Sequence, residues 1–201
     1  MGKLLNPRTP RLGFFGGTFD PPHNGHLQIA KIAIEKAQLD KLLFCPAHQA
    51  PLRTEPAFFS ALDRLSMVKK ICQDHSHMEA YDAEIKHAKT RYSYETIEEV
   101  RSQFPDHELF FILGDDQFSR LAEWKKVDLL ATLVHFLVFA RQSSHLRKPG
   151  IQNLRFSFMD NSLIHLSSSE IRAQLRCNRL PGASIPREVA SYIRNHNLVS
   201  S

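Results

Sequence analysis

The sequence predicts an α/β protein built on a mainly parallel β-sheet that is covered by helices on both faces. Two observations predict this fold. Short apolar runs alternate along the chain with segments in which apolar residues recur every three or four positions. With 201 residues, the chain can bury a sizeable core without metal or disulfide staples. Strands that alternate with helices form right-handed crossovers, so we expect a doubly wound, Rossmann-like arrangement.

The first half of the chain predicts three strands. The run at 11–15 ends at two glycines, and an amphipathic helix follows at 26–39. A second strand at 41–45 leads into a proline-containing loop at 46–59. Ser60 resembles a helix start. We expect that helix to bury one face, which consists of Leu62, Leu65, Val68 and Ile71. A weak strand follows at 78–81.

The second half repeats the alternation. A helix at 94–104 stops at Pro105, and a strand at 108–113 ends at Gly114. Further elements are expected at 117–121 (helix), 125–130 (helix), 134–140 (strand), 154–158 (strand), 169–177 (helix) and 186–196 (helix). Ligands of such sheets bind beyond the carboxyl ends of the strands. The strand ends to consider are Gly16-Gly17, Pro46, Gly114 and Arg141.

Composition excludes several classes of protein. Three well-separated cysteines exclude a disulfide scaffold and a paired CxxC zinc site, and they suit a reducing compartment such as the cytoplasm. The longest apolar stretch, 129–140, is too short for a membrane helix, and no signal peptide is expected at the N-terminus. The net charge of +5 favours anionic ligands, but no Lys/Arg-rich run indicates nucleic-acid binding. We expect residues 1–10 to be a lead-in and residues 11–201 to be one domain.

The most informative segment joins the first strand to the first helix and reads GGTFDPPHNGH, residues 16–26. Five of the eight glycines lie in the first 25 residues, so special backbone geometry is expected there. Gly16 and Gly17 would let a phosphate approach main-chain N–H groups, and a helix N-terminus suits a polyanion. His23 and His26 can converge on one ligand. The segment matches neither dinucleotide-binding nor P-loop glycine patterns.

Other interpretations of this segment stay open. The glycines could form a simple tight turn, and the histidines could be solvated. A zinc site at His23 and His26 is a further alternative, although no other Cys or His stands at ligand spacing.

A second segment, LSSSEIR at 166–172, resembles a helix N-terminus with hydroxyl caps and an arginine one turn in. Exposed N–H groups, hydroxyls and the Arg172 guanidinium would form a second polyanion site. The alternative is an ordinary helix cap beside a surface arginine.

The first segment resembles the (H/T)-x-G-H signature of the nucleotidyltransferase superfamily, in the GGTFDPPHxGH form of bacterial nicotinate-nucleotide adenylyltransferases. The second is similar to the family motif I-S-S-T-x-I-R, with Leu166 and Ser169 in place of Ile and Thr. Residues 46–53 resemble P-x4-P-H-K, with Leu52 in place of His. Residues 92–96 resemble the family's S-Y-T-Y-D-T from its second residue, with Arg91 before them. Residues 112–124 resemble I-G-x-D…L…W.

The resemblance implies transfer of AMP from ATP to nicotinate mononucleotide, as part of NAD biosynthesis. It assigns catalysis to His23, His26 and Arg172. The implied ATP-binding residues are Gly16, Gly17, Thr18, Phe19, Gly25 and Ser168. The implied pyridine-nucleotide residues are Arg53, Ser93, Asp116, Trp124 and Lys125. Mg²⁺ would arrive with ATP, without a protein metal site.

Several alternatives accompany this assignment. Trp124 could be a core anchor and Asp116 a helix cap. The acceptor could instead be nicotinamide mononucleotide, phosphopantetheine or a cytidylyl substrate, or the protein could be a nucleotide sensor without catalysis. A role in DNA or RNA binding has only the basic charge in its favour.

Overall fold

The computed structural model describes residues 8–49, 55–140, 148–160 and 166–199. Within this part of the chain, six strands form one sheet in the order β3-β2-β1-β4-β5-β6, and every neighbouring pair is parallel. The strands are β1 (Arg11–Gly17), β2 (Lys41–Pro46), β3 (Met78–Ala80), β4 (Glu108–Gly114), β5 (His135–Phe139) and β6 (Phe156–Met159). The order reverses between β1 and β4, which makes their carboxyl ends the topological switch point.

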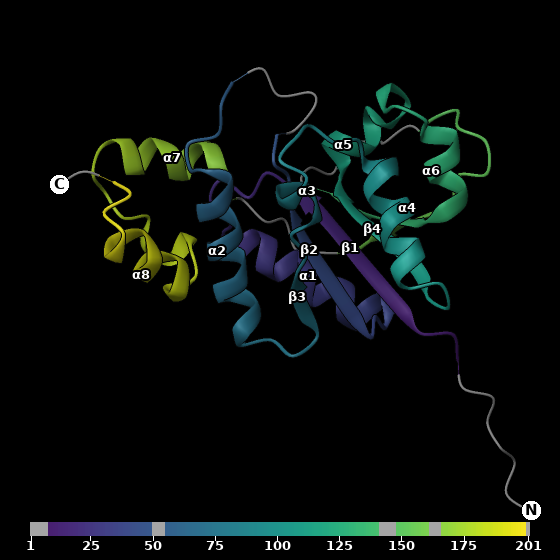
Figure 1. The fold of residues 1–201 in the computed structure, drawn as a ribbon, viewed down its shortest axis with the longest axis horizontal. Helices are drawn as coiled ribbons and strands as arrows, with labels where there is room; N and C mark the ends of the chain where they lie inside the picture. The colour runs from purple at the N-terminus through teal and green to yellow at the C-terminus, as the bar shows by residue number, and fades with distance from the viewer. Residues whose placement is uncertain (1–7, 50–54, 141–147, 161–165, 200–201) are drawn as a thin grey trace, which may run out of the picture.

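Helices cover both faces of the sheet, as the sequence predicts (Figure 1). On one face, α1 (Asn24–Ala37) and α2 (Ala61–Gln73) pack on the side of β4 that presents Phe110 and Ile112. On the other face, α4 (Ser93–Gln103) and α6 (Val127–Leu133) pack on the side that presents Leu109, Phe111 and Leu113. Successive side chains of β4 point to opposite faces of the sheet, so this strand contributes to two separate hydrophobic cores.

The C-terminal helices form a third cluster with α2. Helix α7 (Ser168–Arg176) and helix α8 (Arg187–Asn195) lie beside α2, far from α4 and α6 (Figure 1). The apolar side chains that join the three helices are Met67, Ile71, Ile171, Leu175, Val189 and Ile193. The remaining elements are α3 (Ala83–Lys86), α5 (Asp115–Ser119), η1 (Leu121–Glu123) and η2 (Gly182–Ser184).

Two features differ from the sequence expectation. Leu62 is 67% exposed, so its predicted place on the buried face of α2 is wrong. The reason is that a spacing of three residues drifts around a helix of 3.6 residues per turn. Leu62 therefore lies on the opposite side of α2 from Ile71, which packs with Met67 against α7 and α8. The four-residue helix α3 was not predicted, because it is too short to show a helical period.

A buried arginine fixes the loops at the carboxyl edge of the sheet. Arg64 of α2 is 1% exposed, and its guanidinium donates to the carbonyl oxygens of Thr18 (2.6 Å), Ala47 (2.7 Å), His48 (3.1 Å) and Phe59 (3.3 Å). These carbonyls belong to the segment after β1, the segment after β2 and the loop before α2. One cation therefore holds three loops together at the end of the sheet where ligands are expected.

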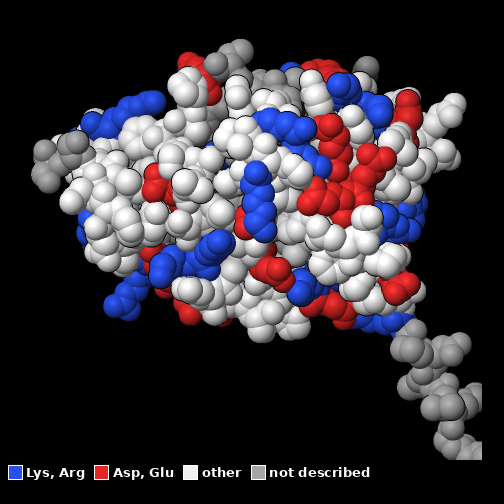
Figure 2. Space-filling view, in the orientation of Figure 1, with Lys and Arg blue, Asp and Glu red and all other residues white. Residues whose placement is uncertain are grey.

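The surface visible in Figure 2 carries Lys and Arg side chains interspersed with Asp and Glu. Among the residues that the structure describes, no helix has the length and apolar character needed to cross a membrane.

Candidate active site

A cavity of about 690 Å³ opens at the carboxyl ends of β1 and β4, where the strand order reverses. Every predicted site residue within the described ranges lines it, from Gly16 in β1 to Arg172 in α7. The exception among the predicted residues, Arg53, lies outside the described residues. The cavity therefore brings together the predicted segments from both ends of the chain.

Gly16 and Gly17 differ from expectation in their backbone. They are the last two residues of β1, where they pair with Cys45 and Pro46 of β2. Neither has a positive φ; the left-handed residue of this segment is Phe19, at φ 50°. A Cβ at Gly16 would meet the Phe14 ring at 3.0 Å, and one at Gly17 would meet the Phe19 ring at 3.1 Å. The glycines thus make room for neighbouring aromatic rings.

Phe19 packs its ring edge-on against the ring of His26. Its side chain is 2% exposed, and its ring centroid lies 5.3 Å from Phe15, 5.5 Å from Phe44 and 4.9 Å from His26. Because this ring is buried among others, Phe19 can offer a ligand its main chain rather than its side chain.

The two histidines lie together at the start of α1. Their ring centroids are 3.7 Å apart in a stacked arrangement. The main-chain N–H of His23, the N-cap residue, donates to Nδ1 of His26 at 3.2 Å. An accepting Nδ1 leaves the proton of a neutral His26 ring on Nε2. Among the described residues, no group of three or more His, Cys, Asp or Glu could hold a metal ion.

The second predicted segment contacts the first directly. Arg172 Nη1 donates to the carbonyl oxygen of Asp20 at 2.9 Å, and Ser168 Oγ donates to the carbonyl oxygen of Pro21 at 3.3 Å. Ser167 caps α7 by accepting from the N–H of Glu170 at 3.2 Å. The N-terminus of α7 is therefore fixed against the segment that leads into α1.

Asp20 is a residue whose role the sequence did not indicate. Its carboxylate is 1% exposed and accepts from the N–H groups of Phe58 (2.8 Å) and Phe59 (2.9 Å), and its Oδ2 lies 3.8 Å from Arg172 Nη1. It thereby links two segments of the cavity wall, those of Asp20 and Arg172, to the loop before α2. All these partners are distant in sequence, so no local pattern could reveal them.

Trp124 lies between the core and the cavity. Its ring meets Phe111 of β4 edge-on, with centroids 5.7 Å apart. Its Nε1 is buried and has no hydrogen-bond partner among the described residues. Lys125 follows, with its Nζ 4.3 Å from the centroid of the Tyr92 ring. Both the core-anchor interpretation and the cavity interpretation of Trp124 therefore have structural support.

Asp116 is exposed in the first turn of α5, and Ser93 is the first residue of α4; both line the cavity. The alternative that Asp116 caps a helix is wrong, because the N-cap of α5 is Gly114. The neighbouring carboxylate, Asp115, accepts from the N–H of Asp116 instead, at 2.9 Å.

Besides Asp20, the charged residues of the cavity wall that were not predicted as site residues are Glu84, Arg91, Arg120 and Glu123. Glu84 of α3 and Arg91 before α4 are each 8% exposed. Burial raises the pKa of Glu84 to about 7, against the opposing effect of the hydroxyl of Thr96, which donates to Oε1 at 3.1 Å. Arg91 donates to Glu99 at 2.6 Å and to the carbonyl oxygen of Glu95 at 2.9 Å.

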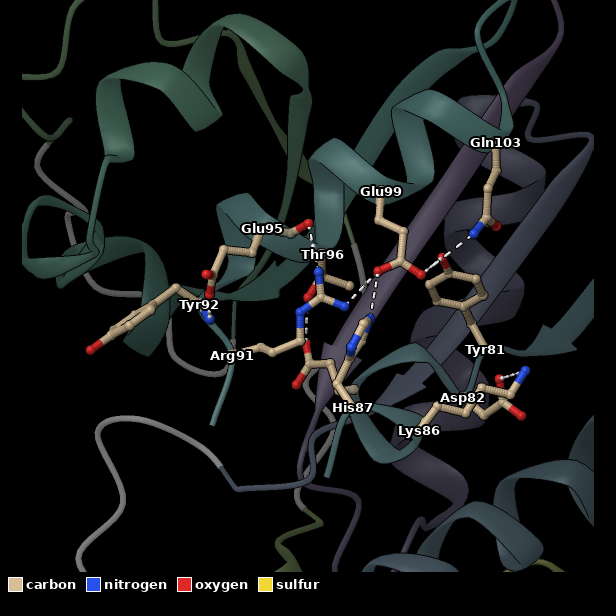
Figure 3. A network of polar contacts seen from close by, with 11 residues as sticks. Tyr81, Asp82, Lys86, His87, Arg91, Tyr92, Glu95, Thr96, Glu99 and Gln103 are labelled. Atoms are coloured by element: carbon tan, nitrogen blue, oxygen red, sulfur yellow. Dashed lines mark hydrogen bonds and ion pairs between the residues drawn. The ribbon is translucent and has the colours of Figure 1, made fainter. Parts of the chain in front are cut away.

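Figure 3 shows Arg91 and His87 converging on the carboxylate of Glu99, with Tyr81 beside it. Burial alone would raise the pKa of Glu99, but the hydrogen bonds from Arg91, His87 and Tyr81, together with the charge of Arg91, lower it. The position of Arg91 in the cavity wall is therefore set by an ionised partner outside the cavity.

The family model described as cytidylyltransferase-like matches residues 14–174. The chain is 36% identical to the probable nicotinate-nucleotide adenylyltransferase of Clostridium acetobutylicum, over 92% of this chain and 96% of that protein. It is 30% identical to the nicotinate-nucleotide adenylyltransferase of Bacillus subtilis, over 95% of this chain and 99% of that protein. The chain belongs to the cytidylyltransferase-like family and, within it, to the nicotinate-nucleotide adenylyltransferases.

Solved structures share the fold. Two structures of Plasmodium falciparum nicotinic acid mononucleotide adenylyltransferase, complexed with APC and with NaAD, superpose with TM-scores of 0.73 and 0.71. Each is 17% identical in sequence and covers 94% of this chain and 97% of the other.

We expect Asp20→Asn to destabilise the fold. An Asn side chain can accept from only one of the two N–H groups, of Phe58 and Phe59, that the carboxylate now satisfies. Leaving one buried N–H without a partner costs about 1–3 kcal/mol of the free energy of unfolding. Denaturant unfolding measures this loss of stability, with Asp106→Asn at an exposed position as the matched control. Equal stability of the two variants would contradict the assigned role.

Proposed function

We propose that this protein transfers the adenylyl group of ATP to nicotinate mononucleotide, giving nicotinate adenine dinucleotide and pyrophosphate. The observation that carries the proposal is the direct contact of Arg172 and Ser168 with the main chain at Asp20 and Pro21 in one cavity. Nearly full-length similarity to nicotinate-nucleotide adenylyltransferases supports it.

The proposed reaction needs no strong general base. The second pKa of a phosphate monoester is about 6, so the nucleotide phosphate is already largely ionised at neutral pH. One of its oxygens forms a bond to the α-phosphorus of ATP, and the bond from that phosphorus to the bridging oxygen breaks as pyrophosphate leaves. The protein contributes by holding two polyanions in line and by stabilising the charge that moves.

The triphosphate binds between α1 and α7 in this proposal. Main-chain N–H groups of the segment from Gly16 to Phe19, together with Gly25, face the polyanion, and His23 and His26 donate to its phosphates. Arg172 and Ser168 contact it from α7. The positive ends of two helix dipoles add to the attraction. Mg²⁺ accompanies ATP and keeps several water ligands, as this ion generally does.

The pyridine nucleotide binds at the other end, beside α4. The ring stacks on Trp124, and the Ser93 hydroxyl and the main-chain N–H of Lys125 hold its carboxylate. Asp116 contacts ribose, and Arg53, which lies outside the described residues, supplies a cation. Hydroxyl and N–H donors satisfy a carboxylate but leave the NH₂ group of an amide without an acceptor. The acid is therefore the preferred substrate.

The free cysteines suit a cytoplasmic enzyme, which is the location we propose. Cys45 is buried, Cys72 is partly buried and Cys177 is exposed, and none is in a disulfide. Burial raises the pKa of Cys45 well above its usual range and that of Cys72 to about 12. Both stay protonated at neutral pH, which makes them poor disulfide formers.

The proposal is tested by turnover of nicotinate and nicotinamide mononucleotides side by side with ATP and Mg²⁺, with release of pyrophosphate measured. We expect faster turnover of the acid. Faster turnover of the amide would show that the proposed acceptor is wrong. Nucleotide binding without pyrophosphate release would indicate a sensor.

We expect His26→Asn to lower kcat by about 10²–10³-fold, the usual cost of losing one charge-stabilising donor. The Asn oxygen can replace Nδ1 as the acceptor for the His23 N–H but provides no donor in place of Nε2. Pyrophosphate release and thermal unfolding are measured together, with His75→Ala, outside the cavity, as the control. A wild-type kcat would remove His26 from the mechanism.

We expect Trp124→Ala to raise KM for the pyridine nucleotide by about tenfold, because a lost aromatic contact typically costs 0.5–1.5 kcal/mol beyond its area. KM for ATP should change little, and Trp124→Phe should restore most of the loss. Steady-state kinetics with each substrate varied in turn measure the two KM values. Equal effects on the two KM values would count against stacking.

A further inference from the structure

Glu84 has no part in the proposed reaction, although it lines the same cavity as Ser93, Trp124 and Lys125. Its Oε1 accepts from Thr96, which lies one helical turn after Ser93 on α4. Residues three apart on a helix are neighbours, with Cβ atoms about 5–6 Å apart. The Glu84 carboxyl is therefore fixed to the part of α4 that begins with the proposed carboxylate-binding hydroxyl.

We propose that Glu84 is a specificity-determining residue whose proton sets the preference of this site for an acid over an amide pyridine nucleotide. The inference deepens the proposed function and rests on it. With its proton, the Glu84 carboxyl is neutral and tolerates a substrate carboxylate nearby. Without its proton, it repels that carboxylate and offers an acceptor to the NH₂ of an amide.

The surroundings of Glu84 place the ionisation of its carboxyl near neutral pH. Burial is the largest influence on its pKa and raises it to about 7. Arg91 and Arg64 act in the opposite direction, Glu95 acts in the same direction as burial, and the Cys45 thiol also lies close by. Arg91 is paired with Glu99, so its charge is largely balanced locally.

The link between the Glu84 proton and substrate binding predicts how the preference for the acid changes with pH. Below pH 7 Glu84 is mostly protonated and the acid is favoured; above pH 7 it is mostly ionised and the advantage of the acid shrinks. The protonated fraction of a group with a pKa of about 7 falls about tenfold between pH 6 and pH 8. Conversely, binding of the acid should draw a proton onto Glu84, because an anionic ligand favours the neutral carboxyl.

The test is the ratio of kcat/KM for nicotinate mononucleotide to kcat/KM for nicotinamide mononucleotide, measured from pH 6 to pH 8. The nucleotide phosphate, ATP and the rest of the phosphate-binding site are common to both reactions, so the effects of pH on them cancel in the ratio. We expect the wild-type ratio to fall about tenfold across this range. In Glu84→Gln the ratio should not change with pH, because the amide keeps an acceptor for Thr96 but has no titrating proton.

Two further variants sharpen the result. Thr96→Val removes the hydrogen bond that stabilises ionised Glu84, so the fall in the ratio should move to higher pH. Glu98→Gln changes an exposed carboxylate of the same helix outside the cavity and should behave as wild type.

Proton uptake on binding is a second, independent measurement. Binding enthalpies in buffers of different ionisation enthalpy, without ATP, should show more proton uptake at pH 7.5 for the acid than for the amide. Glu84→Gln should abolish this difference.

The outcomes separate the two proposals. A wild-type protein that forms dinucleotide with a ratio independent of pH, and that takes up equal protons with both nucleotides, overturns the role of Glu84 and leaves the proposed function standing. Failure to form dinucleotide from either nucleotide at any pH overturns both. Because wild-type protein alone gives these readings, poor folding of a variant cannot obscure them.

Discussion

The contact between the N-terminus of α7 and the main chain at Asp20 and Pro21 determines whether this cavity can act as one site. Arg172 and Ser168 come from a helix that packs with α2 and α8, away from the sheet centre. Their bonds to the segment before α1 bring two helix N-termini to one cavity. Without that contact, each would be an ordinary helix end, unable to surround a polyanion.

Two buried charges maintain the loops that make this contact. Asp20 receives two N–H groups from the loop before α2, and Arg64 gathers carbonyl oxygens from three segments. Each charge binds main-chain groups of loops distant in sequence, so it restrains backbone positions. Main-chain restraint suits a site that uses N–H groups to bind phosphates, because their positions must be set before the ligand arrives.

The sequence predicted the fold well, because its strands are apolar runs separated by amphipathic helices. It also pointed to the two segments that meet in the cavity, 16–26 and 166–172, since the chemically informative residues of each are clustered in sequence. It failed where partners are distant or elements are short. Asp20 and Arg64 bind main-chain groups of other loops, which no local pattern records. Glu84 lies in a four-residue helix, and its burial by α4 is a tertiary effect.

The account is tested most directly by a crystal structure of this protein with Mg²⁺ and a non-hydrolysable ATP analogue. It predicts phosphate oxygens within hydrogen-bond distance of both the His23–His26 turn and Arg172 in the same complex. A triphosphate that contacts only one of these segments, or that binds outside the cavity, would contradict it.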